Sequence, residues 1–379
     1  MPLTNLEKKE FALRGFSRRH FGRLATLLAA GSSLPFYNEP ALAQLSKVEI
    51  DAPADAVMIN ANENPLGPCP EAREAVANII SRGGRYLFGE TDRVAAILAR
   101  QEQLKQNYVQ IYAGSSAPLH QAVLAFTSPT SSFVTGDPGY EAGERAAGFI
   151  GAKVVRVPLT KEYAHDVRAM AAVPDAGLIY ICNPNNPTGT LTPKADIEWL
   201  VANKPKGAVV MIDEAYTHIA GAPFNSDLVA ADKDVIVLRT FSKIYGMAGL
   251  RAGAALARPD LLSKVIGYGA GMMPITGMVA ASASLESKNL IPERRKKIAD
   301  IRSDVFSFLD QRKFQFVPSV SNCFMVNVKQ PGRNIIAAMQ KEKVYIGRVW
   351  PSWPTYVRVT VGTAEEMARF KTAFAKVMA

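Results

Sequence analysis

Residues 235–257 read "VIVLRTFSKIYGMAGLRAGAALA" and place one lysine in a turn between two apolar runs. The runs at 235–240 and 252–257 are short and apolar, as is typical of strands covered on both faces. Lys243 follows the first run, and Arg251 precedes the second. A lysine at a strand end usually lies in solvent, but its amine can also act as a nucleophile. The rest of the chain has to decide between these two interpretations.

Short apolar runs alternate with helical patterns over most of the chain. The predicted strands are 108–114, 132–138, 153–159, 178–183, 209–216, 235–240 and 252–257. One of the helical patterns is 192–203, where Thr192 is expected as the cap and Pro193 as the first helical residue. This order predicts an α/β fold with a mainly parallel, mixed seven-stranded sheet between helices.

The pattern changes towards the C-terminus. A long helix is predicted at 292–312, with Ile298, Ile301, Val305 and Phe308 at helical spacing. Two short strands and a closing helix follow, which predicts a smaller α+β domain. We therefore expect these divisions of the mature chain: an N-terminal arm and small-domain segment at 44–70, a large domain at 71–284 and a small C-terminal domain at 285–379.

The N-terminal segment is typical of an export signal. Arg18 and Arg19 stand together in "SRRHFGRL", an apolar run follows, and Ala41–Ala43 forms a small-x-small cleavage pattern. The paired arginines resemble a twin-arginine signal, so residues 1–43 are excluded from the predicted fold. The alternative is a basic amphipathic helix of the mature protein. The signal predicts use of the twin-arginine machinery and a periplasmic or secreted protein, or a cytoplasmic one if the signal is not used.

Charge and cysteine content exclude several classes of protein. The formal net charge is +10, of which residues 1–43 carry +3, and the remaining +7 includes no dense Lys/Arg run. This mild bias does not favour nucleic-acid binding. Cys69, Cys182 and Cys323 are odd in number and far apart, which indicates neither a metal site nor a disulfide framework. Cys182 and Cys323 are expected in the core.

Polar residues follow the predicted strands, where open α/β sheets bind their ligands. They are Ser115, Ser116, Tyr140, Asn186, Asp213, Tyr216, Ser242 and Lys243. Each alone has an ordinary interpretation as a cap, a turn residue or surface packing. Together with Arg251 they supply an amine, a carboxylate, hydrogen-bonding groups and a phosphate cradle. This set fits pyridoxal 5′-phosphate, whose aldehyde reacts with a lysine amine and whose pyridine nitrogen needs a carboxylate partner.

The sequence resembles the fold-type I pyridoxal-phosphate aminotransferases of class I/II, and among them the histidinol-phosphate aminotransferases. The motifs that carry this resemblance are "NENPLGP" at 62–68, "NPNNPTG" at 183–189, "DEAY" at 213–216, "SKIYGMAGLRAG" at 242–253 and "VRVTVGT" at 357–363. The resemblance implies amino transfer between an L-amino acid, aromatic or like histidinol phosphate, and a 2-oxo acid. It also implies a homodimer with shared active sites.

The resemblance further implies a role for each motif residue. Lys243 forms the aldimine with the cofactor, and Asp213 faces the pyridine nitrogen. The other implied cofactor contacts are Ser115, Ser116, Tyr140, Asn186, Tyr216, Ser242 and Arg251, with Tyr86 reaching into the partner's site. The implied substrate contacts are Arg358, Arg348 and Asn64. Lys243, Asp213 and Tyr216 form the catalytic set.

Three features depart from the family pattern. Ser116-Ala117 replaces an acidic pair, and "RYL" at 85–87 replaces "RYP". Two tryptophans surround Arg348 in "GRVWPSWPTY", which favours an aromatic or apolar substrate side chain. Two alternatives to amino transfer stay open: a decarboxylase, lyase or racemase that uses the same cofactor, and an exported binding protein that uses none.

Overall fold

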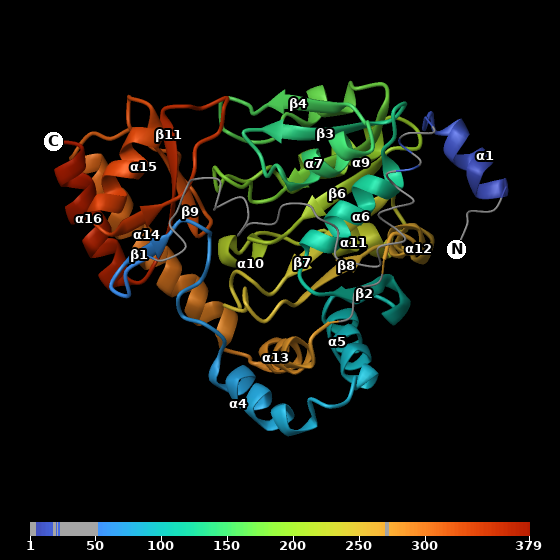
Figure 1. Cartoon of the computed structure of the whole chain (residues 1–379), viewed down its shortest axis with the longest axis horizontal. Helices are drawn as coiled ribbons and strands as arrows, with labels where there is room; N and C mark the ends of the chain where they lie inside the picture. Colours follow the sequence, from blue (N-terminus) through green and yellow to red (C-terminus); the bar gives the residue numbers. More distant parts are fainter. Residues whose placement is uncertain (1–4, 18–19, 21, 23–51, 270–272) are drawn as a thin grey trace.

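The computed structural model describes residues 5–17, 20, 22, 52–269 and 273–379. Its centre is a seven-stranded sheet in the order β2-β8-β7-β6-β5-β3-β4 (Figure 1). In this sheet β8 runs antiparallel to both its neighbours, and the other strands run parallel to one another. The strands are β2 Val109–Tyr112, β3 Ser132–Asp137, β4 Val154–Pro158, β5 Ala176–Cys182, β6 Val209–Asp213, β7 Val235–Thr240 and β8 Gly253–Leu256. The predicted mixed sheet is confirmed.

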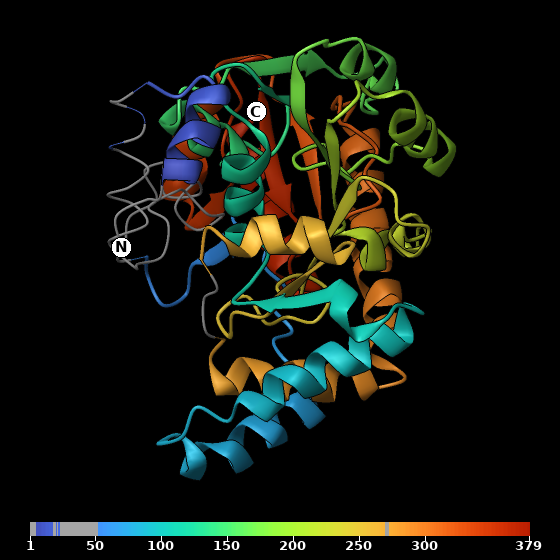
Figure 2. The ribbon, with the colours of Figure 1, turned by 90° about the vertical axis from the view of Figure 1, so that its right-hand side faces the viewer.

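Helices cover both faces of this sheet (Figure 2). On one face lie α6 Ser116–Phe126, α7 Ala142–Phe149 and α12 Pro259–Ile266. On the other lie α8 Val167–Ala171, α9 Lys194–Asn203 and α11 Ser226–Ala230. Parallel strands need crossover connections, and right-handed crossovers in two opposite directions place helices on two faces. Double coverage explains why β5, β6 and β7 are buried along their whole length.

The predicted start of the helix at 192–203 is wrong in detail. The helix α9 begins at Lys194, and Pro193 stands at the N-cap without a side-chain cap. The Thr192 hydroxyl instead accepts a hydrogen bond from the His165 amide at 3.1 Å. The Thr192 amide donates to Asn183 Oδ1 at 2.8 Å. Thr192 therefore fixes the loop after β5, because tertiary contacts offer it better partners than a local cap.

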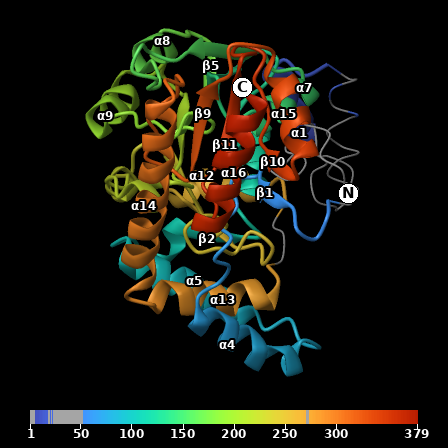
Figure 3. The same ribbon diagram turned by 90° about the vertical axis from the view of Figure 1, so that its left-hand side faces the viewer.

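The C-terminal part contains two small sheets (Figure 3). Strand β9 Cys323–Asn327 pairs antiparallel with β11 Tyr356–Thr360, and β1 Val57–Ile59 pairs parallel with β10 Val344–Ile346. The helices here are α14 Leu290–Gln311, α15 Gly332–Lys341 and α16 Ala364–Val377. The β1–β10 pair was not predicted, because runs of three residues are too short for a periodic pattern. The exact domain boundaries stay a prediction.

Three helices form a separate layer below the main sheet in Figure 1. They are α4 Pro70–Ile79, α5 Phe88–Gln101 and α13 Ile275–Glu286. The helix α13 packs against both others, and α5 also contacts β2. Short helical turns are also present at Ile80–Arg82, Gln106–Tyr108 and Thr217–Ala220, the last being α10.

Part of the predicted signal segment contacts the folded body. Asn5–Leu13 forms the helix α1, and Phe16 is buried. Nη2 of Arg14 donates to the carbonyl oxygens of Leu124, Ala125 and Thr127, each at 2.9 Å, at the C-terminal end of α6. A cation is favourable there because the helix dipole is negative at its C-terminus. Arg18, Arg19 and Ala41–Ala43 lie outside the described residues. Across the described ranges, we find no helix that combines the length and apolar character needed to span a membrane.

A buried ion network ties the ends of two central strands together. Nη2 of Arg239, near the end of β7, lies 2.8 Å from a Glu102 carboxylate oxygen and 2.9 Å from one of Glu214. The other Glu214 oxygen accepts hydrogen bonds from the main chain and side chain of Asn225, each at 2.8 Å. Burial raises the pKa of Glu214, and the Arg239 charge opposes that shift. The network includes Glu214, the residue after Asp213, and Arg239, four residues before Lys243.

We predict that Arg239→Met lowers the free energy of unfolding by about 3–5 kcal/mol, because it leaves two carboxylates in the interior without their cation. Urea denaturation measures this change. The matched control is Arg258→Met, which removes part-exposed ion pairs with Asp234 and Asp260. It should cost less than about 1 kcal/mol. Equal effects of the two variants would contradict the structural role of the buried network.

Candidate active site

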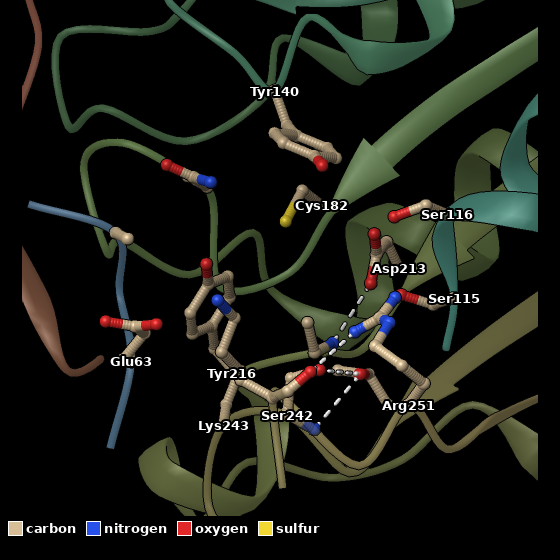
Figure 4. Close-up of a pocket in the computed structure, with 15 residues that line it drawn as sticks. Glu63, Ser115, Ser116, Tyr140, Cys182, Asp213, Tyr216, Ser242, Lys243 and Arg251 are labelled. Atoms are coloured by element: carbon tan, nitrogen blue, oxygen red, sulfur yellow. Dashed lines mark hydrogen bonds between the residues drawn. The ribbon is translucent and has the colours of Figure 1, made fainter. Parts of the chain in front are cut away.

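One pocket collects the polar residues that follow the central strands (Figure 4). It has about 660 Å³ of space, part of which opens to solvent, and is within the range of small-ligand sites. Its lining residues are Ala61, Glu63, Ser115, Ser116, Tyr140, Cys182, Asn186, Asp213, Ala215, Tyr216, Thr240, Ser242, Lys243, Ala248 and Arg251. All nine predicted cofactor contacts from this chain's own strand ends therefore lie around one cavity.

Lys243 is held in this pocket by a residue from the N-terminal segment. Its Nζ donates to the Asn62 carbonyl oxygen at 2.9 Å and lies 5.6 Å from the centre of the Tyr216 ring. The Asn62 side-chain amide donates to the Tyr216 hydroxyl at 3.0 Å. Asn62 has φ 53°, a left-handed conformation that asparagine tolerates better than most residues. Asn62 thus positions both the amine and the phenol, a role that its motif did not reveal.

Asn64 lies next to the lysine but faces its main chain. Its side-chain amide donates to the carbonyl oxygens of Lys243 at 3.0 Å and Ile244 at 3.2 Å. Its side-chain oxygen accepts from the Leu66 amide at 3.1 Å. Asn64 therefore fixes the backbone that carries the lysine. Its predicted contact with substrate stays a prediction.

Asp213 ends β6 and is buried. Its carboxylate accepts hydrogen bonds from the Tyr180 hydroxyl at 2.9 Å and from the Ala215 amide at 3.1 Å. Burial raises the pKa of Asp213 to about 6, and the Tyr180 hydrogen bond opposes that shift. Tyr180 was not predicted as a site residue, because it lies inside β5. Cys182 of β5 pairs directly with Asp213 of β6. Tyr180 lies two residues before Cys182 on the same face of β5, so its side chain reaches Asp213 diagonally across the two strands.

A cradle for an anion lies at the start of α6. Ser115 is the N-cap residue and Ser116 the first helical residue, so free amides and the helix dipole face the pocket. The Arg251 guanidinium donates to the carbonyl oxygens of Ala248 at 2.9 Å and Ala113 at 3.3 Å. Burial lowers the pKa of Arg251, and a bound anion would counteract that effect. Ser242 completes the cradle, and its hydroxyl accepts from the Thr240 hydroxyl at 3.0 Å.

The backbone of the cradle leaves no room for extra atoms. Gly114 has φ +92°, and a Cβ at this position would collide with the Arg251 guanidinium. Arg251 itself has φ 56°, which costs free energy for a long side chain and persists only where the surroundings fix it. The cradle is therefore a built feature that fits a phosphate group.

Tyr140 and Cys182 form the opposite wall. Figure 4 shows Tyr140 across the pocket from Ser242 and Lys243, in a position to cover a flat ring between them. Cys182 was expected as a core residue and is buried. It also lines the pocket, which was not predicted. Burial raises the pKa of its thiol, which therefore stays protonated. Glu63 and Thr240 also line the pocket and were not predicted.

The two predicted substrate arginines are not among the residues that line the pocket. Arg358 is fully buried and donates to Asn186 Oδ1 at 2.9 Å and to the Asn60 carbonyl oxygen at 2.6 Å. Arg348 is also buried and forms an ion pair with Glu141. Arg358 is thus one side chain away from the pocket through Asn186.

Tyr86 stands apart from the other predicted residues. It is 66% exposed, stacks on Phe88 with ring centres 5.6 Å apart, and is not among the lining residues of this chain's own pocket. Its predicted contact with a partner subunit's site stays a prediction. Among the described residues, no cluster of His, Cys, Asp or Glu could hold a metal ion.

The pocket has the groups that pyridoxal 5′-phosphate requires: a buried lysine, a buried carboxylate and a phosphate cradle. This combination is typical of enzymes that hold pyridoxal phosphate on a lysine. Residues 54–374 match the family model described as aminotransferase class I and II, and the chain belongs to this family.

Similar proteins agree with this assignment. The chain is 30% identical to a histidinol-phosphate aminotransferase of Moorella thermoacetica, over 86% of each chain. It is 32% identical to an aromatic amino acid aminotransferase of Cutibacterium acnes, over 83% of this chain and 90% of the relative. The crystal structure of histidinol-phosphate aminotransferase from Sinorhizobium meliloti, in complex with pyridoxal-5′-phosphate, superimposes with a TM-score of 0.80 at 25% identity, covering 93% of this chain and 96% of that one. The protein is a pyridoxal-phosphate-dependent aminotransferase.

We predict that cofactor affinity falls below about pH 6, where the Asp213 carboxyl becomes protonated in the free protein. A protonated Asp213 cannot form an ion pair with the pyridine nitrogen, so the Kd should rise by up to about tenfold per pH unit. Tyr180→Phe removes a hydrogen bond that lowers the Asp213 pKa, so cofactor affinity should begin to fall at a higher pH. Equilibrium dialysis at several pH values measures both effects. If the affinity of the Tyr180→Phe variant begins to fall at the same pH as that of the unchanged protein, Tyr180 does not have this role.

Proposed function

We propose that Lys243 is the residue that binds the cofactor covalently and moves the proton during amino transfer between an L-amino acid and a 2-oxo acid. The observation that supports this most directly is that the Lys243 amine and the Asp213 carboxylate share one pocket with the anion cradle. When bound, the cofactor supplies an electron-accepting ring that stabilises negative charge at the substrate Cα. The side chains of the chain supply positioning, proton transfer and exclusion of water.

The proton is carried by Lys243. With the cofactor and an amino acid bound, the free Lys243 amine would be the base that takes the proton from the substrate Cα. Asn62 keeps Nζ within reach through its carbonyl oxygen, at 2.9 Å. The Tyr216 ring centre lies 5.6 Å from Nζ, and the Tyr216 hydroxyl accepts a hydrogen bond from the Asn62 side-chain amide at 3.0 Å. We assign Asn186 and Tyr216 to the ring oxygen of the cofactor, and Ser115, Ser116, Ser242 and Arg251 to its phosphate.

Arg358 would bind the substrate α-carboxylate. A guanidinium offers two parallel N–H groups, which match the geometry of a carboxylate. Arg358 is already oriented by Asn186 and by the main chain of Asn60. Similar proteins are named for histidinol phosphate and for aromatic amino acids, and the aromatic surroundings of Arg348 favour an aromatic amino donor.

We predict that Lys243→Ala abolishes turnover and the visible absorbance of the lysine-bound cofactor. Without the Lys243 amine, the protein can neither bind the cofactor covalently nor transfer the proton. Spectra of the purified protein and an assay for the 2-oxo acid and the aminated acceptor measure the two effects. Lys297→Ala, in an exposed position on α14, is the control and should behave as the unchanged protein. Transamination by the Lys243 variant would exclude the role of this lysine, and carbon dioxide release by the unchanged protein would favour a decarboxylase.

We also propose that the protein is a homodimer in which Tyr86 contacts the cofactor phosphate of the partner subunit. Tyr86 and its neighbour Phe88 are 66% and 64% exposed, unusual values for adjacent aromatic side chains. Both lie at the start of α5, in the layer that α4, α5 and α13 form beside the main sheet (Figure 2). A partner subunit would cover these rings.

If Tyr86 donates to the partner's phosphate group, Tyr86→Phe should weaken cofactor binding by about tenfold or more, since hydrogen bonds to charged groups contribute 1.5–3 kcal/mol. The control is Tyr108→Phe, which removes a hydroxyl bonded to Asp232 on the surface. The Kd for pyridoxal phosphate is measured on the dimer, whose mass is first established by light scattering. A monomer, or a Kd unaffected by Tyr86→Phe, would contradict this proposal.

Finally, we propose that the paired arginines direct the folded protein through the twin-arginine export machinery to the periplasm or the exterior. A folded, cofactor-loaded protein is the cargo that such a route suits. Substituting Arg18→Lys together with Arg19→Lys should leave the protein in the cytoplasm, as measured by cell fractionation. Arg23→Lys in the same segment is the control and should not affect export. Normal export of the double variant would mean that the arginine pair is not a signal.

A further inference from the structure

Two loops beside the active site contact each other through every second residue, and their residue numbers run in opposite directions. The Ser352 hydroxyl donates to Asp137 Oδ1 at 2.6 Å, and Trp350 Nε1 donates to the Gly139 carbonyl oxygen at 2.8 Å. The third contact is the ion pair between Arg348 and Glu141. The loop at 137–141 also carries Tyr140, which lines the pocket. The position of Glu141 is therefore fixed by its own ion pair and by the two contacts before it.

Arg348 lies in the interior with a carboxylate as its partner. The Arg348 side chain is 6% exposed and that of Glu141 26%. Nε and Nη2 of Arg348 are buried and have no hydrogen-bond acceptor within the described part of the chain. Those two N–H groups are the place where an anionic substrate side chain would bind. Any such anion would meet a guanidinium whose charge Glu141 already balances, and would be repelled by Glu141 itself.

The surroundings of this ion pair are aromatic. The Arg348 guanidinium carbon lies 4.2 Å from the centre of the Trp350 ring, and that of Arg358 lies 5.6 Å from the same ring. Trp350 packs with buried Val317 and Met325 and with three partly buried rings, Tyr163, Trp353 and Tyr356. The two arginines thus share one indole, and Arg348 has the Glu141 carboxylate as its partner.

We infer that Glu141 is a specificity-determining residue: it neutralises Arg348, so that the site takes amino acids with an uncharged, apolar or aromatic side chain and disfavours those with a carboxylate or phosphate. This inference rests on the proposed function, with Arg358 as the group that binds the α-carboxylate. It assigns different tasks to the two arginines, both of which the resemblance implies as substrate contacts.

The test compares two unreactive ligands on the cofactor-loaded enzyme: 3-phenylpropanoate, with one carboxylate and a ring, and glutarate, with two carboxylates. Binding is followed by the change in visible absorbance of the bound cofactor. The unchanged enzyme should bind 3-phenylpropanoate at least about tenfold more tightly than glutarate, since a close charge pair contributes 1.5 kcal/mol or more. Glu141→Gln should tighten glutarate binding by about tenfold and leave 3-phenylpropanoate within about threefold.

The control variant is Glu144→Gln, on the same helix start, whose carboxylate pairs with Arg156. It should leave both affinities unchanged. Equal or tighter binding of glutarate by the unchanged enzyme would overturn the inference without any variant, and so would a Glu141→Gln enzyme with an unaltered preference. An enzyme without visible absorbance after incubation with pyridoxal phosphate would instead overturn the proposed function, so the two failures are distinguishable.

Discussion

The adjacency of β6 and β7 is the constraint on which the active site depends. The two strands run parallel and pair from Val210 with Val235 to Asp213 with Leu238, so they end at the same edge of the sheet. Asp213 closes β6, and Lys243 follows β7. A carboxylate and an amine that are far apart in sequence therefore face one cavity. The Arg239 ion network links Glu214, the residue after Asp213, to the end of β7, four residues before Lys243.

Burial works against the charges that the chemistry needs, and the site contains groups that counteract it. Burial raises the pKa of Asp213 and lowers that of Arg251, so it disfavours the charged form of each group. The Tyr180 hydroxyl and the Ala215 amide stabilise the Asp213 carboxylate. A pyridinium beside Asp213 and a phosphate beside Arg251 would stabilise both charges. The cofactor thus completes an electrostatic arrangement that the protein alone leaves unfavourable.

The N-terminal segment before α4 joins distant parts of the chain at the site. Asn60 accepts from Arg358, Asn62 accepts from Lys243 and donates to Tyr216, and Asn64 donates to the main chain of Lys243 and Ile244. These three asparagines alternate along the chain, and all are buried. The segment that contains these three asparagines therefore orients both the lysine and the predicted substrate arginine.

The sequence by itself determined the seven strands and the polar residues that follow them, because apolar periodicity and strand-end position are local properties. It could not determine the β1–β10 pair, whose strands are too short to show a pattern. Nor could it determine that Tyr180 donates to Asp213, that Asn62 holds Lys243, or that Glu141 neutralises Arg348. Those contacts arise from strand register and from the docking of loops separated by up to hundreds of residues. Only the tertiary structure fixes them, because a side chain's partner depends on which backbone lies beside it and not on its own neighbours in sequence.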